Sequence, residues 1–588
     1  MQDSVQDAPG RDITSTPAAT VVHTEAPKAE VARGPTVSVE TLFWAGLVTA
    51  AGALRLVHIG SPPLTVDEGQ RAFDATRVAG GDVPPTWRGD LAEAATSYLF
   101  RVFGETDLLA RLLPALAGVA LIGLLWLARP YAGRVGALVA AALLAFSPLF
   151  VLYSRSATAF SLGSLLAIVV VVSLFGYLHN PRSALAFPLI VGLALAALTD
   201  AVATLAALAV VVFVVFEGPF FSNAEVRQAW RAFRRSPLRW VTALIVLSAA
   251  IQFGITRFGT SLEGLDLPGL RLFWEMFETP RDSRPPEYHL ALLLAYDWPV
   301  LLGGTAGFIF LVMRFLRQRR ESTAFERFLL LWTLAASLAL ALVTRREAGQ
   351  LLMLLLPLAL LAGRLVEELA GRADWAAAGR WWPTGVAIAA ATGAAAVLMT
   401  EWSSGSADRA ERLTLIASVA VGLALAVIVL ARVWRAGAIP VVAVLVALAV
   451  TVFVVHSTFA VAFSNGAEFA VDLRLTPRAA QLRATVDKLA RERGGTIVVD
   501  ADLSDELGWT LRDSPVVFGG PTDRASAVVS RPDANPAGFV ARDETWRMAE
   551  GWYPDEVLAP RRLWRWLLYR EPYSDVNAVD VRIFVRTI

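Results

Sequence analysis

Cysteine is absent from this 588-residue chain, which excludes disulfides, thiolate metal sites and thiol nucleophiles. Charged residues are also scarce, at 18% of the chain, whereas about a quarter is usual in a soluble protein. Hydrophobic residues make up 55%, and the net charge of +1 gives no sign of the basic face that a nucleic-acid-binding protein needs. The sequence therefore predicts an integral membrane protein, with membrane lipids and no nucleic acid as partners.

A secretory signal is lacking as well, because no apolar run follows a basic start in residues 1–39. This stretch is rich in Ala, Pro, Thr and acidic residues, a composition typical of disorder. We expect a disordered N-terminal tail on the cytoplasmic side.

Apolar segments recur from residue 40 to residue 464, and each approaches the length of about 20 residues that a membrane-spanning helix needs. Alternate short loops between them carry most of the arginines, which predicts a cytoplasmic N-terminus and an extracytoplasmic C-terminus in the plasma membrane. The pattern indicates about 13 spans, near 40–58, 108–128, 135–153, 158–178, 184–199, 202–217, 240–257, 291–313, 327–344, 349–366, 384–400, 412–431 and 438–463.

Two outward loops are long. The first, 58–107, contains amphipathic stretches near 66–79 and 91–103, and the second, 258–289, contains apolar residues at helical spacing. Helices of this kind lie in the membrane interface. Such a loop suits an enzyme that acts on a lipid-linked substrate, and it equally suits packing among the headgroups.

Hydropathy falls beyond residue 465, and short apolar strands alternate with a helix. We predict a soluble, extracytoplasmic α/β domain over 465–588. No glycine-rich phosphate loop follows a strand, so a nucleotide site is unsupported. The predicted strands are 496–500, 515–518, 525–529 and 579–585, with a helix at 504–512. The fold class is thus a mostly α, polytopic membrane protein with a C-terminal α/β domain.

Two acidic residues, Asp67 and Glu68, follow the first span. A carboxylate at the membrane boundary is a candidate general base that deprotonates an acceptor hydroxyl as it attacks an anomeric carbon. The alternative is a capping box, with Thr65 as N-cap and Glu68 three residues later. The sequence leaves both readings open.

Arginines near the outer face are candidates for phosphate binding, because the planar guanidinium matches phosphate oxygens. Arg155 lies between two spans, and Arg345 and Arg346 lie in a tight outward loop. The alternative is that they extend to the lipid headgroups. Asp107 and Arg111, four residues apart at a helix start, suggest a surface ion pair.

Metal binding has little support, because the histidines are scattered without ligand spacing. His58 and His289 could approach one another at the outer surface, but two histidines without further ligands are weak support for a metal site.

An ordered set of motifs resembles the GT-C class of membrane glycosyltransferases, and within it the flippase-activity-associated glycosyltransferase-like proteins first named from archaeal N-glycosylation. The likeness covers nearly everything after the N-terminal tail. The motifs are Asp67-Glu68, the stretch 103–118, Ser147-Pro148 leading to Tyr153-Ser-Arg155, the stretch 285–290, the stretch 327–333 and the stretch 563–572.

This resemblance implies transfer of a sugar from a polyprenyl-phosphate donor to an extracytoplasmic glycan or protein acceptor, with inversion. Asp67 would be the base, and Glu68 would orient substrate or bind a metal. Together with the arginine argument above, the candidate substrate-binding residues are Arg155, Tyr153, Arg345, Arg346 and His289. The resemblance implies no definite cofactor, and it leaves a divalent metal ion and the oligomeric state open.

Several polar positions depart from the family pattern. Val66 replaces a His before the acidic pair, the stretch 156–160 replaces an Arg-His-Asp, and Thr199-Asp200-Ala201 replaces a Thr-Lys-Glu. A degenerate, non-catalytic subunit that binds lipid-linked glycan is therefore the rival hypothesis. An enzyme predicts an outward cavity with Asp67 and an arginine facing each other, whereas a scaffold predicts that side chains fill this region.

Overall fold

The computed structural model describes most of residues 38–372 and 454–587; the longest gaps inside these ranges are 251–266 and 555–561. Contacts divide the chain into residues 1–43 and 44–588, and the second unit contains nearly every described residue. The predicted N-terminal tail, 1–39, lies almost wholly outside the described residues.

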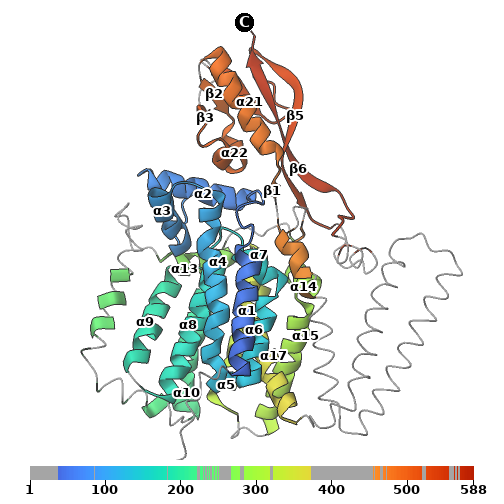
Figure 1. Ribbon diagram of the computed structural model, residues 1–588. Coiled ribbons are helices and arrows are strands. Elements are labelled where there is room, and N and C mark those ends of the chain that lie inside the picture. The colour runs from blue at the N-terminus through green and yellow to red at the C-terminus, as the bar shows by residue number, and fades with distance from the viewer. Residues whose placement is uncertain are drawn as a thin grey trace, which may run out of the picture. The chain divides into compact units, whose positions relative to one another are not determined.

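Helices dominate the described part before residue 372 (Figure 1). Six are long and apolar enough to cross a membrane, or seven if one bent pair counts as a span. They are α1 (Val39–Leu56), α4 with its extension (Asp107–Ala132), α8 (Phe160–His179), α15 (Trp298–Arg317), α16 (Ala324–Leu342) and η2 with α17 (Ala348–Arg372). The chain is thus a multi-pass membrane protein.

The predicted count of about 13 is not confirmed. Segments 184–199 and 202–217 form shorter apolar helices, α9 (Ser183–Ala197) and α10 (Ala201–Phe221). Segments 384–400 and 412–431 lie outside the described residues, as do much of 240–257 and most of 438–463.

Two predicted spans are interrupted. The segment 135–153 forms α6 (Arg134–Ala145) and α7 (Pro148–Ser154), which meet at 64°. Proline at the first position of α7 cannot continue the hydrogen bonding of α6, and Ser147 caps the new helix by accepting from Phe150 N. The segment 291–313 likewise forms α14 (Tyr288–Tyr296) and α15, which are separated by Asp297.

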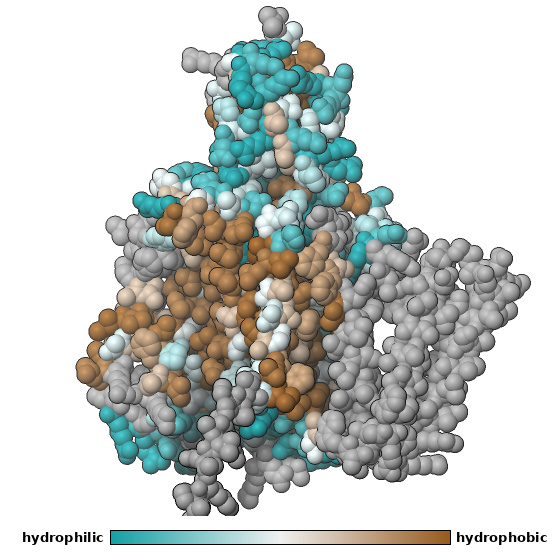
Figure 2. All heavy atoms as spheres, viewed as in Figure 1, coloured by the Kyte–Doolittle hydropathy of each residue, from teal (hydrophilic) through white to brown (hydrophobic). Residues whose placement is uncertain are grey.

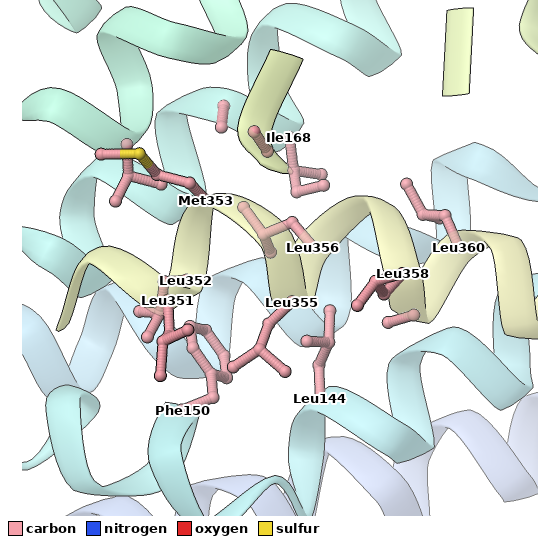
Figure 3. Packing of buried hydrophobic residues seen from close by; sticks show 14 of the residues in the cluster. Leu144, Phe150, Ile168, Leu351, Leu352, Met353, Leu355, Leu356, Leu358 and Leu360 are labelled. Atoms are coloured by element: carbon pink, nitrogen blue, oxygen red, sulfur yellow. The ribbon is translucent and has the colours of Figure 1, made fainter. Parts of the chain in front are cut away.

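Close helix packing forms the core of the bundle, in which α17 contacts α6 and α15 (Figure 3). Glycine permits this approach: a Cβ atom on Gly136 would lie 2.9 Å from the carbonyl oxygen of Gly363. Small residues at such crossings are typical of membrane helices. On the face seen in Figure 2 the helices are largely apolar, as expected for contact with lipid, whereas the C-terminal domain is largely polar.

Both predicted helices of the first outer loop are present, as α2 (Val66–Ala79) and α3 (Leu91–Phe103). In the second long loop, α13 (Pro268–Glu278) is described, and 279–283 and 251–266 are not. Asp90 begins α3 by accepting from Ala92 N and Glu93 N at 2.9 Å each.

The C-terminal domain contains a six-stranded mixed sheet in the order β1-β5-β6-β4-β2-β3. β2 pairs in parallel with β3 and β4, and the remaining neighbours are antiparallel. The four predicted strands and one helix are confirmed, but the longest strand, β5, and helix α21 were not predicted. The elements are β1 (Arg474–Leu475), α21 (Arg478–Arg493), β2 (Thr496–Val499), α22 (Ser504–Leu511), β3 (Val516–Phe518), β4 (Ala525–Ser530), β5 (Phe539–Trp552) and β6 (Val576–Arg586).

The first outer loop shares one hydrophobic core with this sheet domain. Phe100 of α3 stacks on Trp509 of α22, with ring centroids 5.7 Å apart. The indole N–H of Trp509 donates to Asp107 at 2.9 Å. The predicted partner of Asp107 was wrong, because Arg111 binds Glu68 instead. The sheet domain therefore helps to hold α2, which carries Asp67.

Candidate active site

The start of α2 forms the predicted capping box. Thr65 Oγ1 accepts from Glu68 N at 3.2 Å, and Glu68 Oε2 accepts from Thr65 N at 2.8 Å. Glu68 is also bound by Arg111, which donates to its two carboxylate oxygens at 2.8 Å each. Ala157 N donates to it at 2.7 Å. This buried carboxylate thus ties α2 to α4 and to the loop before α8.

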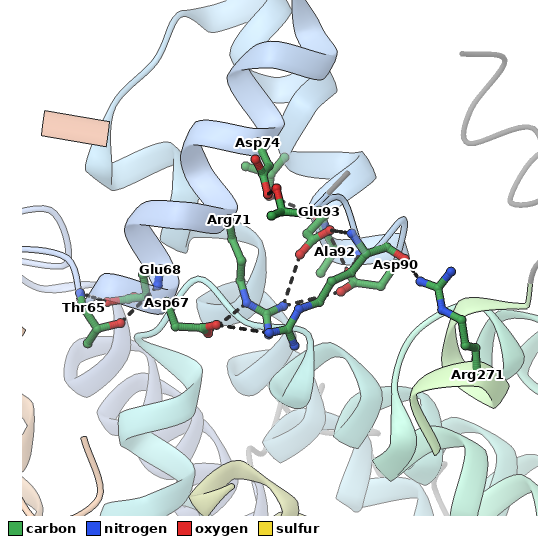
Figure 4. A network of polar contacts seen from close by, with 12 residues as sticks. Thr65, Asp67, Glu68, Arg71, Asp74, Asp90, Ala92, Glu93 and Arg271 are labelled. Carbon is green, nitrogen blue, oxygen red and sulfur yellow. Dashed lines mark hydrogen bonds and ion pairs between the residues drawn. The ribbon is translucent and has the colours of Figure 1, made fainter. Parts of the chain in front are cut away.

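Asp67, the next residue toward the N-terminus, points elsewhere. Its side chain is 48% exposed, and it accepts from Arg71 at 2.9 Å and from Arg88 at 3.3 Å (Figure 4). Desolvation raises the pKa of Asp67, but Arg71, Arg88 and then Arg345 outweigh it, so the net pKa is lowered. The carboxylate is therefore ionised at neutral pH, with lone pairs left for a further donor.

Arg71 is the centre of a buried charge network in Figure 4. Besides Asp67, its guanidinium lies 3.4 Å from Glu93 and 3.5 Å from Asp90. Burial, and then the negative charge of the neighbouring Asp90, raise the pKa of Glu93, and Arg71 offsets them only in part. The network fixes Arg71, and through it the carboxylate of Asp67.

A cavity of about 280 Å³ opens beside Asp67. Tyr153, Arg345 and Arg346 also line it, so the structure brings four of the predicted site residues together. Asp505, at the first turn of α22, lines the same cavity. The sheet domain thus contributes an acidic side chain to a site that the sequence placed in the membrane part alone.

The loop between α16 and η2 presents the two predicted arginines differently. Arg345 is 53% exposed and pairs with Glu347 at 3.1 Å. Arg346 is buried, and its guanidinium donates to the carbonyl oxygen of Arg284 at 2.7 Å. Arg345 is therefore the one whose guanidinium faces the cavity with the most room for a ligand.

His289 lies behind this loop and not in the cavity lining. Its Nε2 is 3.2 Å from the carbonyl oxygen of Glu347. Burial lowers the pKa of His289 to about 4, so the ring is neutral at physiological pH. The geometry gives it a supporting contact with the arginine loop.

Arg155 has a structural role in this geometry. Its guanidinium donates to the carbonyl oxygens of Leu54 and Val57 at 2.8 and 3.0 Å, at the C-terminal end of α1. The terminal carbonyls of a helix lack partners within it, and a cation there is favourable. Arg155 is buried and does not line the cavity beside Asp67.

Sequence reasoning missed Arg71 and Arg88, the two cations that hold Asp67. The i, i+4 spacing of Asp67 and Arg71 on an amphipathic helix was the available signal. Arg88 and Asp505 reach the site through tertiary packing, and no local sequence pattern predicts their position.

A divalent metal ion does not match the donors at this site. Among the described residues, no three His, Cys, Asp or Glu side chains gather as a metal site would require. The oxygens of Asp67 and Glu68 are bound by arginines.

Comparison with known proteins agrees with this architecture. Residues 91–252 match the family model described as dolichyl-phosphate-mannose-protein mannosyltransferase. The chain is similar to the crystal structure of ArnT from Cupriavidus metallidurans bound to undecaprenyl phosphate, with 16% identity, a TM-score of 0.56, and coverage of 89% of this chain and 99% of ArnT. The fold is that of a GT-C class membrane glycosyltransferase. The sequence prediction of this class is confirmed.

Other comparisons add less. The apo form of the same ArnT gives a TM-score of 0.54 at 17% identity, with coverage of 87% of this chain and 98% of ArnT. An oligosaccharyltransferase from Archaeoglobus fulgidus is similar at 12% identity and a TM-score of 0.49, over 84% of this chain and 69% of that one. Curated protein sequences give no significant match. The narrower likeness to the flippase-activity-associated proteins stays a prediction.

Proposed function

We propose that this chain transfers a sugar from a polyprenyl-phosphate-linked donor to an acceptor hydroxyl, with Asp67 as the general base. The observation that carries the proposal is the cavity in which the half-exposed carboxylate of Asp67 and the guanidinium of Arg345 are both presented. A scaffold would have filled this region with side chains. The family match and the GT-C fold support the same reaction class.

In the proposed reaction, the acceptor oxygen attacks the anomeric carbon while its proton passes to the Asp67 carboxylate. The bond between the anomeric carbon and the phosphate oxygen breaks, and the phosphate leaves with the electron pair. Its charge would be balanced by Arg345, with Arg346 behind it. Arg71 and Arg88 keep Asp67 ionised and oriented before the acceptor arrives.

The orientation of the chain is part of the proposal. Loops rich in arginine would face the cytoplasm, and α2, α3 and the domain over 465–588 would lie outside. ArnT was crystallised with undecaprenyl phosphate. By analogy, the donor here would be a polyprenyl-phosphate sugar, and the acceptor a lipid-linked glycan or a protein.

The test is transfer of labelled sugar from polyprenyl-phosphate donors in proteoliposomes, with wild type compared to Asp67→Asn. General base catalysis contributes about 10²–10⁴-fold, so transfer should fall by that factor while the protein stays folded. Asp82→Asn is the matched control, because Asp82 lies in the same outer loop, is exposed, and pairs with Arg77. Equal transfer by wild type and Asp67→Asn would remove Asp67 from catalysis.

A further inference from the structure

A second cavity of about 360 Å³ borders the first, and Phe160, Arg345 and Glu347 line both. Its volume falls within the range of about 300–1,000 Å³ that small-molecule sites occupy. Arg71 and Arg88, which hold Asp67, line this second cavity. Asp67 itself lines only the first of the two.

Two buried aspartates line the second cavity, each at the start of a helix. One carboxylate oxygen of each is used as a cap: Asp90 Oδ1 accepts from the first turn of α3, and Asp200 Oδ1 accepts from Ala203 N at 3.0 Å. The other oxygen differs between the two: Asp200 Oδ2 has no hydrogen-bond partner among the residues that the structure describes, whereas Asp90 Oδ2 lies 3.5 Å from the guanidinium of Arg71. Asp90 is 0% exposed and Asp200 is 3% exposed.

Both oxygens are held in place by the fold. Leu91 N donates to the carbonyl oxygen of Leu198 at 2.9 Å, which joins the two loops that carry the aspartates. Asp200 also lies against α8, where a Cβ atom on Gly163 would overlap its carboxylate. A buried acceptor without a donor, such as Asp200 Oδ2, is rare in native proteins and calls for an explanation.

The chemistry of the lining selects the ligand. Besides Arg71 and Arg88, Arg271 and Arg345 line the cavity, and so do Glu275 and Glu347, which pair with those two arginines. The lining therefore offers hydrogen-bond donors and acceptors together, and a metal ion or an amine would meet cations as well as carboxylates. A ligand here must donate to the buried carboxylates and accept from the arginines. A sugar ring does both, because each hydroxyl can donate one hydrogen bond and accept others.

We infer that this second cavity binds the sugar ring of the donor, whose hydroxyls donate to the Oδ2 atoms of Asp200 and Asp90. The inference rests on the proposed glycosyl transfer. The acceptor reaches Asp67 in the first cavity, and the anomeric carbon lies at the boundary that Phe160 and Arg345 line from both sides. Asp200 is then a residue that determines the affinity for the sugar.

Binding, measured separately from transfer, tests this. The probes are a polyprenyl phosphate carrying mannose, glucose or galactose, and the same polyprenyl phosphate without sugar, each added to the full-length protein in nanodiscs. Wild type should bind at least one sugar-linked lipid about tenfold or more tightly than the bare lipid, the gain expected from one or two buried hydrogen bonds. Asp200→Asn keeps the helix cap but puts a donor where the free acceptor was, so this difference should vanish while bare-lipid binding stays unchanged.

Two further variants protect the test from a folding artefact. Gly163→Ala displaces the Asp200 carboxylate without changing any charge, and it should also reduce the preference. Asp297→Asn is the matched control: Asp297 is buried, has one bonded and one free oxygen, and lines neither cavity.

A preference kept by Asp200→Asn, one lost equally in Asp297→Asn, or none in wild type would overturn the inference. Asp67→Asn should lose transfer and keep the preference. A preference without transfer in any protein would instead refute the proposed catalysis and leave the sugar site in place.

Discussion

Replacement of Glu68 by Gln separates a capping role from a buried ion pair. A capping box accepts Glu or Gln at this position, so capping alone predicts almost no change in stability. The structure predicts otherwise, because Glu68 is 1% exposed and Arg111 donates to both of its carboxylate oxygens at 2.8 Å. The neutral amide leaves the guanidinium of Arg111 buried without its counter-charge.

The expected magnitude is set by that burial. Removing one partner of a buried ion pair costs about 3–5 kcal/mol. Arg111 keeps its bonds to the carbonyl oxygens of Ile59, Pro62 and Pro63, which argues for the lower end. Glu68→Gln should therefore lower the free energy of unfolding by about 3 kcal/mol, and the Arg111→Gln partner variant should show strong coupling in a double-mutant cycle.

The assay is unfolding by sodium dodecyl sulfate in mixed micelles, followed by tryptophan fluorescence. The chain has 18 tryptophans and no cysteine, so thiol-reactive dyes would report nothing. Transfer activity should decline only in step with the folded fraction. An unchanged free energy of unfolding, or lost activity at full stability, would refute the structural role and return Glu68 to the candidate catalytic residues.

Two other predictions concern the charge around Asp67 and the helix packing. Arg88→Gln removes one of the cations that lower the pKa of Asp67, so that pKa rises and the acid limb of the pH profile of kcat/KM should move to higher pH. Arg77→Gln is the control, because it loses only an exposed ion pair and should leave the acid limb in place. An unmoved acid limb in Arg88→Gln would exclude Asp67 as the titrating base. Gly136→Ala should destabilise the bundle by about 1–3 kcal/mol through overpacking against α17. Gly52→Ala, with nothing within 4 Å of its new Cβ, should instead stabilise α1 by up to about 1 kcal/mol. Unfolding titrations of both variants measure the two changes, and equal effects would contradict the close contact between α6 and α17.

The elements predicted correctly are those whose signals lie within their own sequence, such as apolar spacing and N-caps. The amphipathic stretches of the first outer loop became α2 and α3 within a residue of the expected bounds, because apolar spacing and N-caps are encoded nearby. Strand β5 was missed, since its first half is charged and exposed and carries no alternation. Antiparallel pairing with β6 provides the hydrogen bonds of this strand, and the residues of β5 alone do not predict that pairing.

The candidate site was predicted only in part, because most of its contacts join residues that are far apart in the sequence. Asp67 and Arg345 could be selected as outward polar residues at helix ends, and they line one cavity. Arg155 looked equivalent in sequence, yet its donors are used at the end of α1. Asp200 stood out only as a departure from a family motif, and its free oxygen is visible only once α3, α8 and α10 are assembled.

The short ladder between the first outer loop and β1 has a consequence for how the protein is made. Val66 N donates to the carbonyl oxygen of Leu473, and Leu475 N donates to that of Leu64, both at 3.0 Å. The ribosome completes the first of these strands long before the second, and every span in between must be inserted before they can meet. The helix that carries Asp67 is thus secured only at the last stage of biogenesis, so a nascent or truncated chain would already be in the membrane before its site was formed.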